Sequence, residues 1–170
     1  LLEGFVVACF QGRMEFGPRS LGNRSILVSA ADKSVNEWLN TKLKRTEFMP
    51  FAPITLQKYA NKMYKNLSKK KLASKFMTIT TECTKEAIKI SPAAVHIDNT
   101  ARPQIITMKD NKRIYNILKE YYKISKIPNL INTSFNVHEE PIVCSPNDAI
   151  RAFNTSKLDY LYMVEYIVYK

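Results

Sequence analysis

The sequence has 170 residues, of which 45% are hydrophobic and 24% are charged, a composition typical of a globular domain and unlike that of disordered chains. A chain of this length buries roughly 70% of the surface that it exposes when unfolded, so we expect a single domain over residues 1–170. The 26 Lys and Arg residues outnumber the 15 Asp and Glu residues, and the formal net charge of +11 favours an anionic partner. That partner could be nucleic acid, an acidic surface or a phosphorylated small molecule.

The three cysteines, Cys9, Cys83 and Cys144, are far apart and form no CxxC pair. This spacing indicates neither a disulfide framework nor a zinc site, so we expect a cytoplasmic protein with no metal ligands of its own. The longest apolar runs have the length of strands, and no basic-then-apolar leader precedes them, so we expect no membrane association. The chain begins LLE, without methionine, and enters an apolar run at once, so we expect a piece of a longer polypeptide.

Apolar runs and alternating segments predict the strands, and capping residues followed by apolar side chains at helical spacing predict the helices. Strands are expected at 5–10, 25–29, 54–56, 76–81, 95–97, 103–107, 129–131, 160–163 and 166–169. Helices are expected from Asp32 to about Lys44, from about Asn111 to Ile124, and from Ser145. The lysine-rich residues 58–75 predict a solvated face or loop. Strict βαβ alternation is absent, which indicates an α/β or α+β fold with a twisted mixed sheet.

The stretch QGRMEFGPRSLGNRS, residues 11–25, contains three of the four glycines and three arginines. Glycine permits close backbone approach, and the arginine fork binds phosphate or carboxylate oxygens bidentately. The spacing matches neither the dinucleotide fingerprint GxGxxG nor a Walker loop. From these residues alone, anion binding and a structural turn with surface arginines both remain open.

Three further segments carry polar groups beside apolar runs. Lys44-Arg45 ends the first predicted helix, where cations also compensate the helix dipole. In HIDNTARPQ, residues 96–104, Arg102 precedes a proline and is a better ligand candidate than His96, which alone would more often be structural. NTSFN, residues 132–136, offers amide and hydroxyl groups, or forms an ordinary Asx or Ser/Thr turn. No Ser-His-Asp arrangement stands out, which leaves charge stabilisation by arginine and lysine.

Taken together, these motifs resemble those of a known family. They read FQGRMEFGPRSLGNRSIL at 10–27, RTEFMPFAPITL at 45–56, HIDNTARPQ at 96–104, LINTSFNVHEEPIVCSPNDAIRAF at 130–153, and SKLDYLYMVEYIVYK at the end. In this order they resemble the C-terminal domain of the carbamoyltransferase family that includes nodulation protein U, the cephem carbamoyltransferases and tobramycin carbamoyltransferase.

The resemblance implies a YrdC-like domain, with a twisted mixed sheet, flanking helices and a cationic concave face. It also implies an N-terminal actin-like-fold transferase domain, absent from this sequence. In that family the YrdC-like part is thought to form carbamoyl adenylate from ATP and carbamoyl phosphate, and the N-terminal domain moves the carbamoyl group to a hydroxyl acceptor. The implied substrates are ATP with Mg²⁺ and carbamoyl phosphate, with no tightly bound cofactor. A homodimer is left open.

The same resemblance implies roles for individual residues. Arg19 and Lys44 would hold phosphate and carbamoyl oxygens, and Arg102 would clamp the adenylate. Asn132 and Ser134 would orient the nucleotide and the carbamoyl amide. The supporting residues implied at the site are Arg13, Gly17, Arg24, Arg45 and Thr100.

One departure from the family pattern falls in the second motif. Many relatives read FRPFAP where this chain has FMPFAP. The resemblance implies that the arginine at this position would contact nucleotide phosphates; here Met49 replaces it, with Arg45 as a candidate substitute. Two other functions stay open at this point, a basic RNA-binding module and a regulatory domain without activity.

Overall fold

The computed structural model describes residues 1–42, 51–67, 71–137 and 140–170. The predicted site residues Lys44 and Arg45, and the divergent Met49, lie outside these ranges. The elements in chain order are β1 (Val7–Phe10), β2 (Arg24–Ser29), α1 (Val35–Lys42), β3 (Ala52–Leu56), η1 (Gln57–Tyr59), α2 (Ala60–Met63), η3 (Ala73–Lys75), β4 (Thr81–Glu82), α3 (Lys85–Ile90), η4 (Pro92–Ala94), β5 (Thr100–Ala101), β6 (Gln104–Ile106), α4 (Lys112–Ser125), β7 (Asn129–Ser134), α5 (Pro146–Thr155), β8 (Tyr160–Met163) and β9 (Tyr166–Tyr169).

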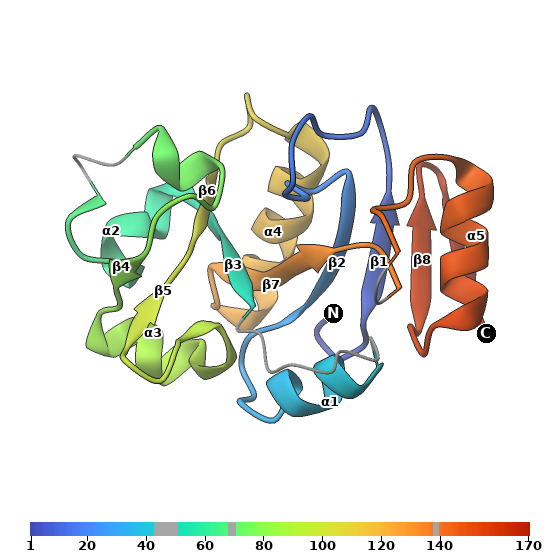
Figure 1. Ribbon diagram of the computed structural model, residues 1–170. Coiled ribbons are helices and arrows are strands. Elements are labelled where there is room, and N and C mark those ends of the chain that lie inside the picture. The colour runs from blue at the N-terminus through green and yellow to red at the C-terminus, as the bar shows by residue number, and fades with distance from the viewer. Residues whose placement is uncertain (43–50, 68–70, 138–139) are drawn as a thin grey trace.

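A mixed seven-stranded sheet in the order β6-β3-β7-β2-β1-β8-β9 forms the centre of the molecule (Figure 1). The pairs β1–β8 and β3–β6 are parallel, whereas β1–β2, β2–β7, β3–β7 and β8–β9 are antiparallel. A separate small ribbon pairs β4 with β5. The expected mixed α/β fold with flanking helices is therefore confirmed.

Alternate residues of the central strands face opposite sides of the sheet, as the period of a strand requires. Ala8 and Ile26 pack into one cluster with Phe153 of α5, while Cys9 and Leu27 pack into another with the α4 side chains. Figure 1 shows α4 behind the sheet and α5 beside β8. Both faces of the central strands are thus covered, which explains why β1 and β2 are almost uniformly buried.

The two best-defined helices begin where their caps predict. The Asn111 side chain accepts from the Ile114 amide at the start of α4 (3.2 Å). Ser145 and Asp148 form a reciprocal capping box at the start of α5, with Pro146 in the first turn. Among the described residues, none of the helices is long and apolar enough to cross a bilayer.

Three sequence predictions differ from the structure. The strand expected at 76–81 is reduced to β4, because η3 and a turn at Met77, with φ of 55°, occupy the preceding residues. The strand expected at 95–97 is instead a turn, in which the His96 amide donates to the Thr100 carbonyl. The strand expected at 129–131 continues as β7 through Ser134 because β2 and β3 flank it on both sides.

Candidate functional site

The glycine-rich and arginine-rich stretch forms the loop between β1 and β2. Glu15, in the middle of this loop, binds the backbone near its end. Oε1 of Glu15 accepts hydrogen bonds from the amides of Leu21 and Asn23, both at 2.7 Å. The Gln11 side chain donates to the Gly22 carbonyl at 3.0 Å, which ties the start of the loop to its end. These bonds connect the start, the middle and the end of the loop to one another.

Two glycines give this loop its turns. Gly17 and Gly22 have φ of 127° and 125°, a region that side chains with a Cβ rarely adopt. A Cβ on Gly22 would lie 2.7 Å from Cγ1 of Ile114 in α4, so this glycine also lets the loop approach the helix. The expected tight glycine turn is confirmed at both positions.

Arg24 supports the loop from beneath. Its side chain is buried, with 4% of the residue exposed, and its guanidinium stacks over the Phe10 ring at 3.7 Å from the centroid. Nη1 donates to the carbonyls of Gln11 at 2.8 Å and Asn23 at 3.0 Å. Burial lowers the pKa of Arg24, which nevertheless stays charged at neutral pH. The structure therefore places this predicted ligand residue in the framework of the loop.

Four of the predicted site residues line one small polar cavity of about 90 Å³: Arg19, Arg102, Asn132 and Ser134. Arg19 comes from the loop, Arg102 from the segment before β6, and the other two from the end of β7. The remaining lining residues are Pro18, Ser20, Phe51, Ala52, Met77 and Thr133, so none of the described lining residues is acidic. The volume equals that of about three waters of ~30 Å³ each, enough for a small anionic group.

The cavity wall is positively charged. Partial burial, followed by the nearby Arg19 guanidinium, lowers the pKa of Arg102, but an arginine remains protonated at neutral pH. Two like charges that line one cavity and are close enough to interact raise the energy of the free protein. An anion between Arg19 and Arg102 would relieve that repulsion.

The cavity also has unsatisfied polar atoms. Oδ1 of Asn132 and Oγ of Ser20 are buried and lack a hydrogen-bond partner. Ser134 donates from Oγ to Oδ1 of Asn136 at 2.6 Å, which fixes its hydroxyl beside the cavity. Buried polar groups are seldom left unpaired, so a ligand that supplies hydrogen-bond partners is expected here.

Of the predicted residues that the structure describes, Arg13 and Thr100 do not line this cavity. Arg13 is exposed, and its carbonyl accepts from the Asn23 side chain at 2.7 Å. Thr100 donates from Oγ1 to Oδ1 of Asp98 at 2.7 Å and lies 3.0 Å from Nδ1 of His96. Since the Thr100 proton is committed to the carboxylate, Nδ1 of His96 donates to Thr100, and Nε2 is left as an acceptor.

Sequence reasoning missed several residues of the site. Ser20 lies inside the recognised motif, and its position beside Arg19 could have indicated it. Gln104 ends the HIDNTARPQ motif and bonds to Asn132 at 2.7 Å. Met77 lies in a segment predicted as a strand, and no pattern in the sequence places it at the cavity.

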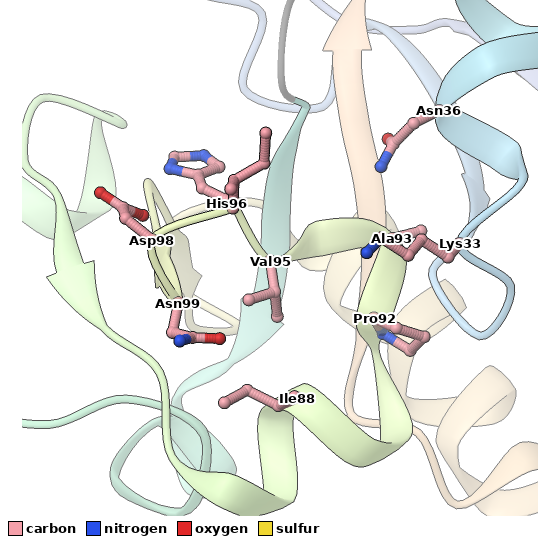
Figure 2. Close-up of a pocket in the computed structure, with 10 residues that line it drawn as sticks. Lys33, Asn36, Ile88, Pro92, Ala93, Val95, His96, Asp98 and Asn99 are labelled. Atoms are coloured by element: carbon pink, nitrogen blue, oxygen red, sulfur yellow. The ribbon is translucent and has the colours of Figure 1, made fainter.

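A second, larger cavity of about 640 Å³ lies between α1 and the segment from η4 to Asn99. Figure 2 shows Asn36 projecting from α1 toward the segment that carries Val95 and His96, with Ile88 and Pro92 on the remaining sides. Asn36 is 9% exposed, and its Oδ1 is buried without a partner. Arg102 is close enough to His96 to contribute to lowering the pKa of that imidazole, after the larger effect of burial.

Fold and site together define an α/β domain with a small cationic cavity at the end of a central strand. Over residues 1–170 the chain matches the family described as Carbamoyltransferase C-terminus, and it belongs to that family.

Individual relatives agree with this assignment. The chain is 35% identical to nodulation protein NolNO of Sinorhizobium fredii, over all of this chain and 25% of that protein. It is 36% identical to nodulation protein NolO of Bradyrhizobium diazoefficiens, over all of this chain and 31% of that protein. An uncharacterized protein of Methanocaldococcus jannaschii is 39% identical over 99% of this chain and 27% of its own length. The chain thus spans about a third or less of these curated relatives.

The fold is similar to that of HypF, solved full-length in a phosphate- and nucleotide-bound form. The TM-score is 0.60 at 19% identity, and the match covers 94% of this chain and 21% of HypF. This similarity confirms the expected fold.

Proposed function

We propose that this domain is the carbamoyl-activating part of an O-carbamoyltransferase and forms carbamoyl adenylate from carbamoyl phosphate and ATP. The observation that carries the proposal is the convergence of Arg19, Arg102, Asn132 and Ser134 on one cavity from distant parts of the chain. Membership of the carbamoyltransferase family and the phosphate- and nucleotide-bound state of HypF support it.

The proposed chemistry has two steps. Water first cleaves carbamoyl phosphate to carbamate and inorganic phosphate. A carbamate oxygen then attacks the α-phosphorus of ATP and forms a new O–P bond. The bond between the α-phosphorus and the oxygen that bridges to the β-phosphate breaks, and pyrophosphate leaves. Two anions must meet in the second step, so a preorganised cationic site lowers its barrier.

In this scheme Arg19 and Arg102 neutralise the phosphate and carbamate oxygens between them. Asn132 and Ser134 orient the carbamoyl group through their amide and hydroxyl. We retain Lys44 and Arg45 as further cations of the site. Arg45 begins the motif of residues 45–56, which contains the described lining residues Phe51 and Ala52, and Lys44 directly precedes it. Arg13, Gly17, Arg24 and Thr100 act through the loops that carry the ligand-binding residues.

The nucleoside needs more room than the small cavity provides, and we place it in the cavity of Figure 2. A volume of about 640 Å³ is typical of small-molecule sites. Asn36 offers an amide of the kind that pairs with the edge of adenine, and Val95 and Pro92 offer apolar walls. Arg102 lies near enough to His96 for the charge of Arg102 to affect the pKa of His96, and in this proposal one nucleotide spans both cavities.

Magnesium enters this scheme with ATP, because the metal bridges phosphate oxygens and offsets their charge. Within the described ranges, no group of three or more His, Cys, Asp or Glu side chains is arranged to hold a metal ion. The phosphates themselves would therefore supply most of its ligands.

Transfer to the final hydroxyl acceptor is assigned to an N-terminal actin-like-fold domain of the same polypeptide. The chain covers only 25–32% of several relatives, which leaves room for such a domain in those proteins. The acceptor is then chosen outside the present 170 residues.

Pyrophosphate release tests the proposal. The chain is incubated with ATP, Mg²⁺ and carbamoyl phosphate, and the natural sequence is compared with Arg102→Ala. Loss of one preorganised charge donor is expected to lower the rate by about 10²–10³-fold. Arg113→Ala, which removes an exposed arginine from α4, is the matched control and should keep the natural rate. Equal rates for Arg102→Ala and the control would remove the proposed role.

A further inference from the structure

Gln104, the first residue of β6, connects two walls of the small cavity without lining it. The residue is 3% exposed. Its Nε2 donates to the Leu21 carbonyl of the glycine-rich loop at 2.8 Å, and its Oε1 accepts from Nδ2 of Asn132 at 2.7 Å. The same Nδ2 donates to the Ser20 carbonyl at 3.2 Å. The side-chain amides of Gln104 and Asn132 therefore form a short chain of hydrogen bonds from the glycine-rich loop to a lining residue of the cavity.

Two backbone carbonyls, those of Leu21 and Ser20, determine which atom of each amide donates in these hydrogen bonds. A carbonyl oxygen only accepts hydrogen bonds, so the atom of Gln104 that faces Leu21 must be nitrogen. Its oxygen then faces Asn132, and the atom of Asn132 that meets both Gln104 and the Ser20 carbonyl must also be nitrogen. The oxygen of Asn132 is consequently the atom left over.

That oxygen is one of two buried side-chain atoms without a partner on residues that line the cavity, the other being Oγ of Ser20. Asn132 is 1% exposed, and its Oδ1 is buried without a partner, although the residue lines the cavity. An acceptor in this state is satisfied by a ligand that brings an N–H or O–H group. Of the groups in carbamoyl phosphate, the amide is the one that donates, and the phosphate belongs with the arginines.

We propose that Gln104 is a positioning residue that makes the site selective for a carbamoyl group. By engaging the Asn132 nitrogen, it leaves the Asn132 oxygen as the unpaired acceptor, which favours an –NH₂ group over a methyl group of similar size. This inference rests on the proposed function, because it names what the acyl end of the substrate must carry. Sites built to pair a substrate N–H reject analogues that lack it, since the buried acceptor is then left unpaired.

The test compares carbamoyl phosphate with acetyl phosphate, which carries a methyl group in place of the amide. Calorimetry on the whole 170-residue chain, without ATP, gives a dissociation constant for each. We expect the natural chain to bind carbamoyl phosphate about 10–100-fold more tightly. In Gln104→Met, which keeps the length of the side chain and removes both hydrogen bonds, the ratio should fall to within about threefold, mainly through weaker binding of carbamoyl phosphate.

Controls separate this role from simple support of the loop. Gln57→Met makes the same change at an exposed residue of η1 and should keep the natural ratio. If Gln104→Met does not fold, as judged by thermal unfolding, Asn132→Leu removes the acceptor itself and should abolish the preference. A variant at Gln104 that weakens both ligands equally would overturn the inference.

Two outcomes with the natural chain tell the inference and the proposed function apart. Equal affinity for the two acyl phosphates overturns the selectivity but leaves the site as an acyl phosphate site. Binding of neither ligand overturns the proposed function, and the inference with it.

Discussion

At the scale of single residues, Gly22 shows that the loop needs a residue without a side chain at this position. Its φ of 125° disfavours any other residue, and the space where a Cβ would lie is filled by Ile114 of α4. Gly17 has nearly the same φ, of 127°, but nothing lies within 4 Å of its Cβ position. Alanine substitution at the two glycines therefore separates the free-energy cost of backbone strain from the cost of steric contact.

We expect Gly22→Ala to lower the free energy of unfolding by about 2–6 kcal/mol, since strain and overpacking each cost about 1–3 kcal/mol. Gly17→Ala should cost only the strain, about 1–3 kcal/mol. Urea unfolding of both variants measures the difference. Equal losses would mean that the loop moves away from α4 at no cost, which would contradict its firm attachment.

At the scale of elements, the segment between η4 and β6 links the two cavities. It carries His96 at the larger cavity and Arg102 at the smaller one. Burial, and then the positive charge of Arg102, lower the pKa of His96, while Asp98 opposes them. Removal of the arginine charge should therefore raise this pKa.

The change is measurable because the chain has two histidines, His96 and His138. Proton NMR titration of Arg102→Ala should show the His96 pKa higher than in the natural chain, and Arg113→Ala should leave it unchanged. The direction of the His96 pKa shift also predicts how the stability of the fold depends on pH. A histidine whose folded pKa is lowered binds more protons when unfolded. Its contribution to stability is therefore complete above the unfolded pKa of about 6.5 and is lost as the pH falls from there through the lower folded pKa. An unchanged His96 pKa in Arg102→Ala would contradict the interaction between the two residues.

At the scale of the whole molecule, the net charge of +11 raises the question of nucleic acid. Many of the lysines of residues 58–75 belong to η1, α2, η3 and their connections. Three of the described lysines pair with acidic groups, Lys62 with Glu86, Lys65 with Glu82 and Lys75 with Asp110. The described cationic cavity lies elsewhere, at the end of β7. This separation favours a small phosphorylated ligand over a long nucleic acid.

We therefore expect the chain to bind ATP more tightly than double-stranded RNA at physiological salt. Fluorescence titrations from about 50 to 200 mM salt provide the measurement, because RNA held by 6–10 phosphate contacts loses roughly 10³–10⁵ in affinity over that range. Tight RNA binding with such a slope, together with no detectable ATP binding, would favour the RNA-binding alternative. Binding of ATP without pyrophosphate release would favour the regulatory alternative.

Much of the fold could be predicted from local patterns. The helix capped by Asn111, the capping box at Ser145, and the strands 160–163 and 166–169 follow from side-chain periodicity and from caps that act within one turn. The missed segments are those where tertiary contacts override propensity. Met77 adopts a positive φ in a run that alternates like a strand, and β7 extends through polar residues because two neighbouring strands pair with it.

The sequence by itself determined the chemical inventory of this protein, namely the arginines, amides and hydroxyls of the motifs and the glycines that allow their loop to turn. Tertiary structure alone decided which of them meet. It buried Arg24 under the loop, brought Arg19 and Arg102 to one cavity with Asn132, and turned the Asn132 amide by way of Gln104. The physical reason is range, since caps and turns act over a few residues, whereas a cavity is made by side chains that only sheet pairing and packing bring together.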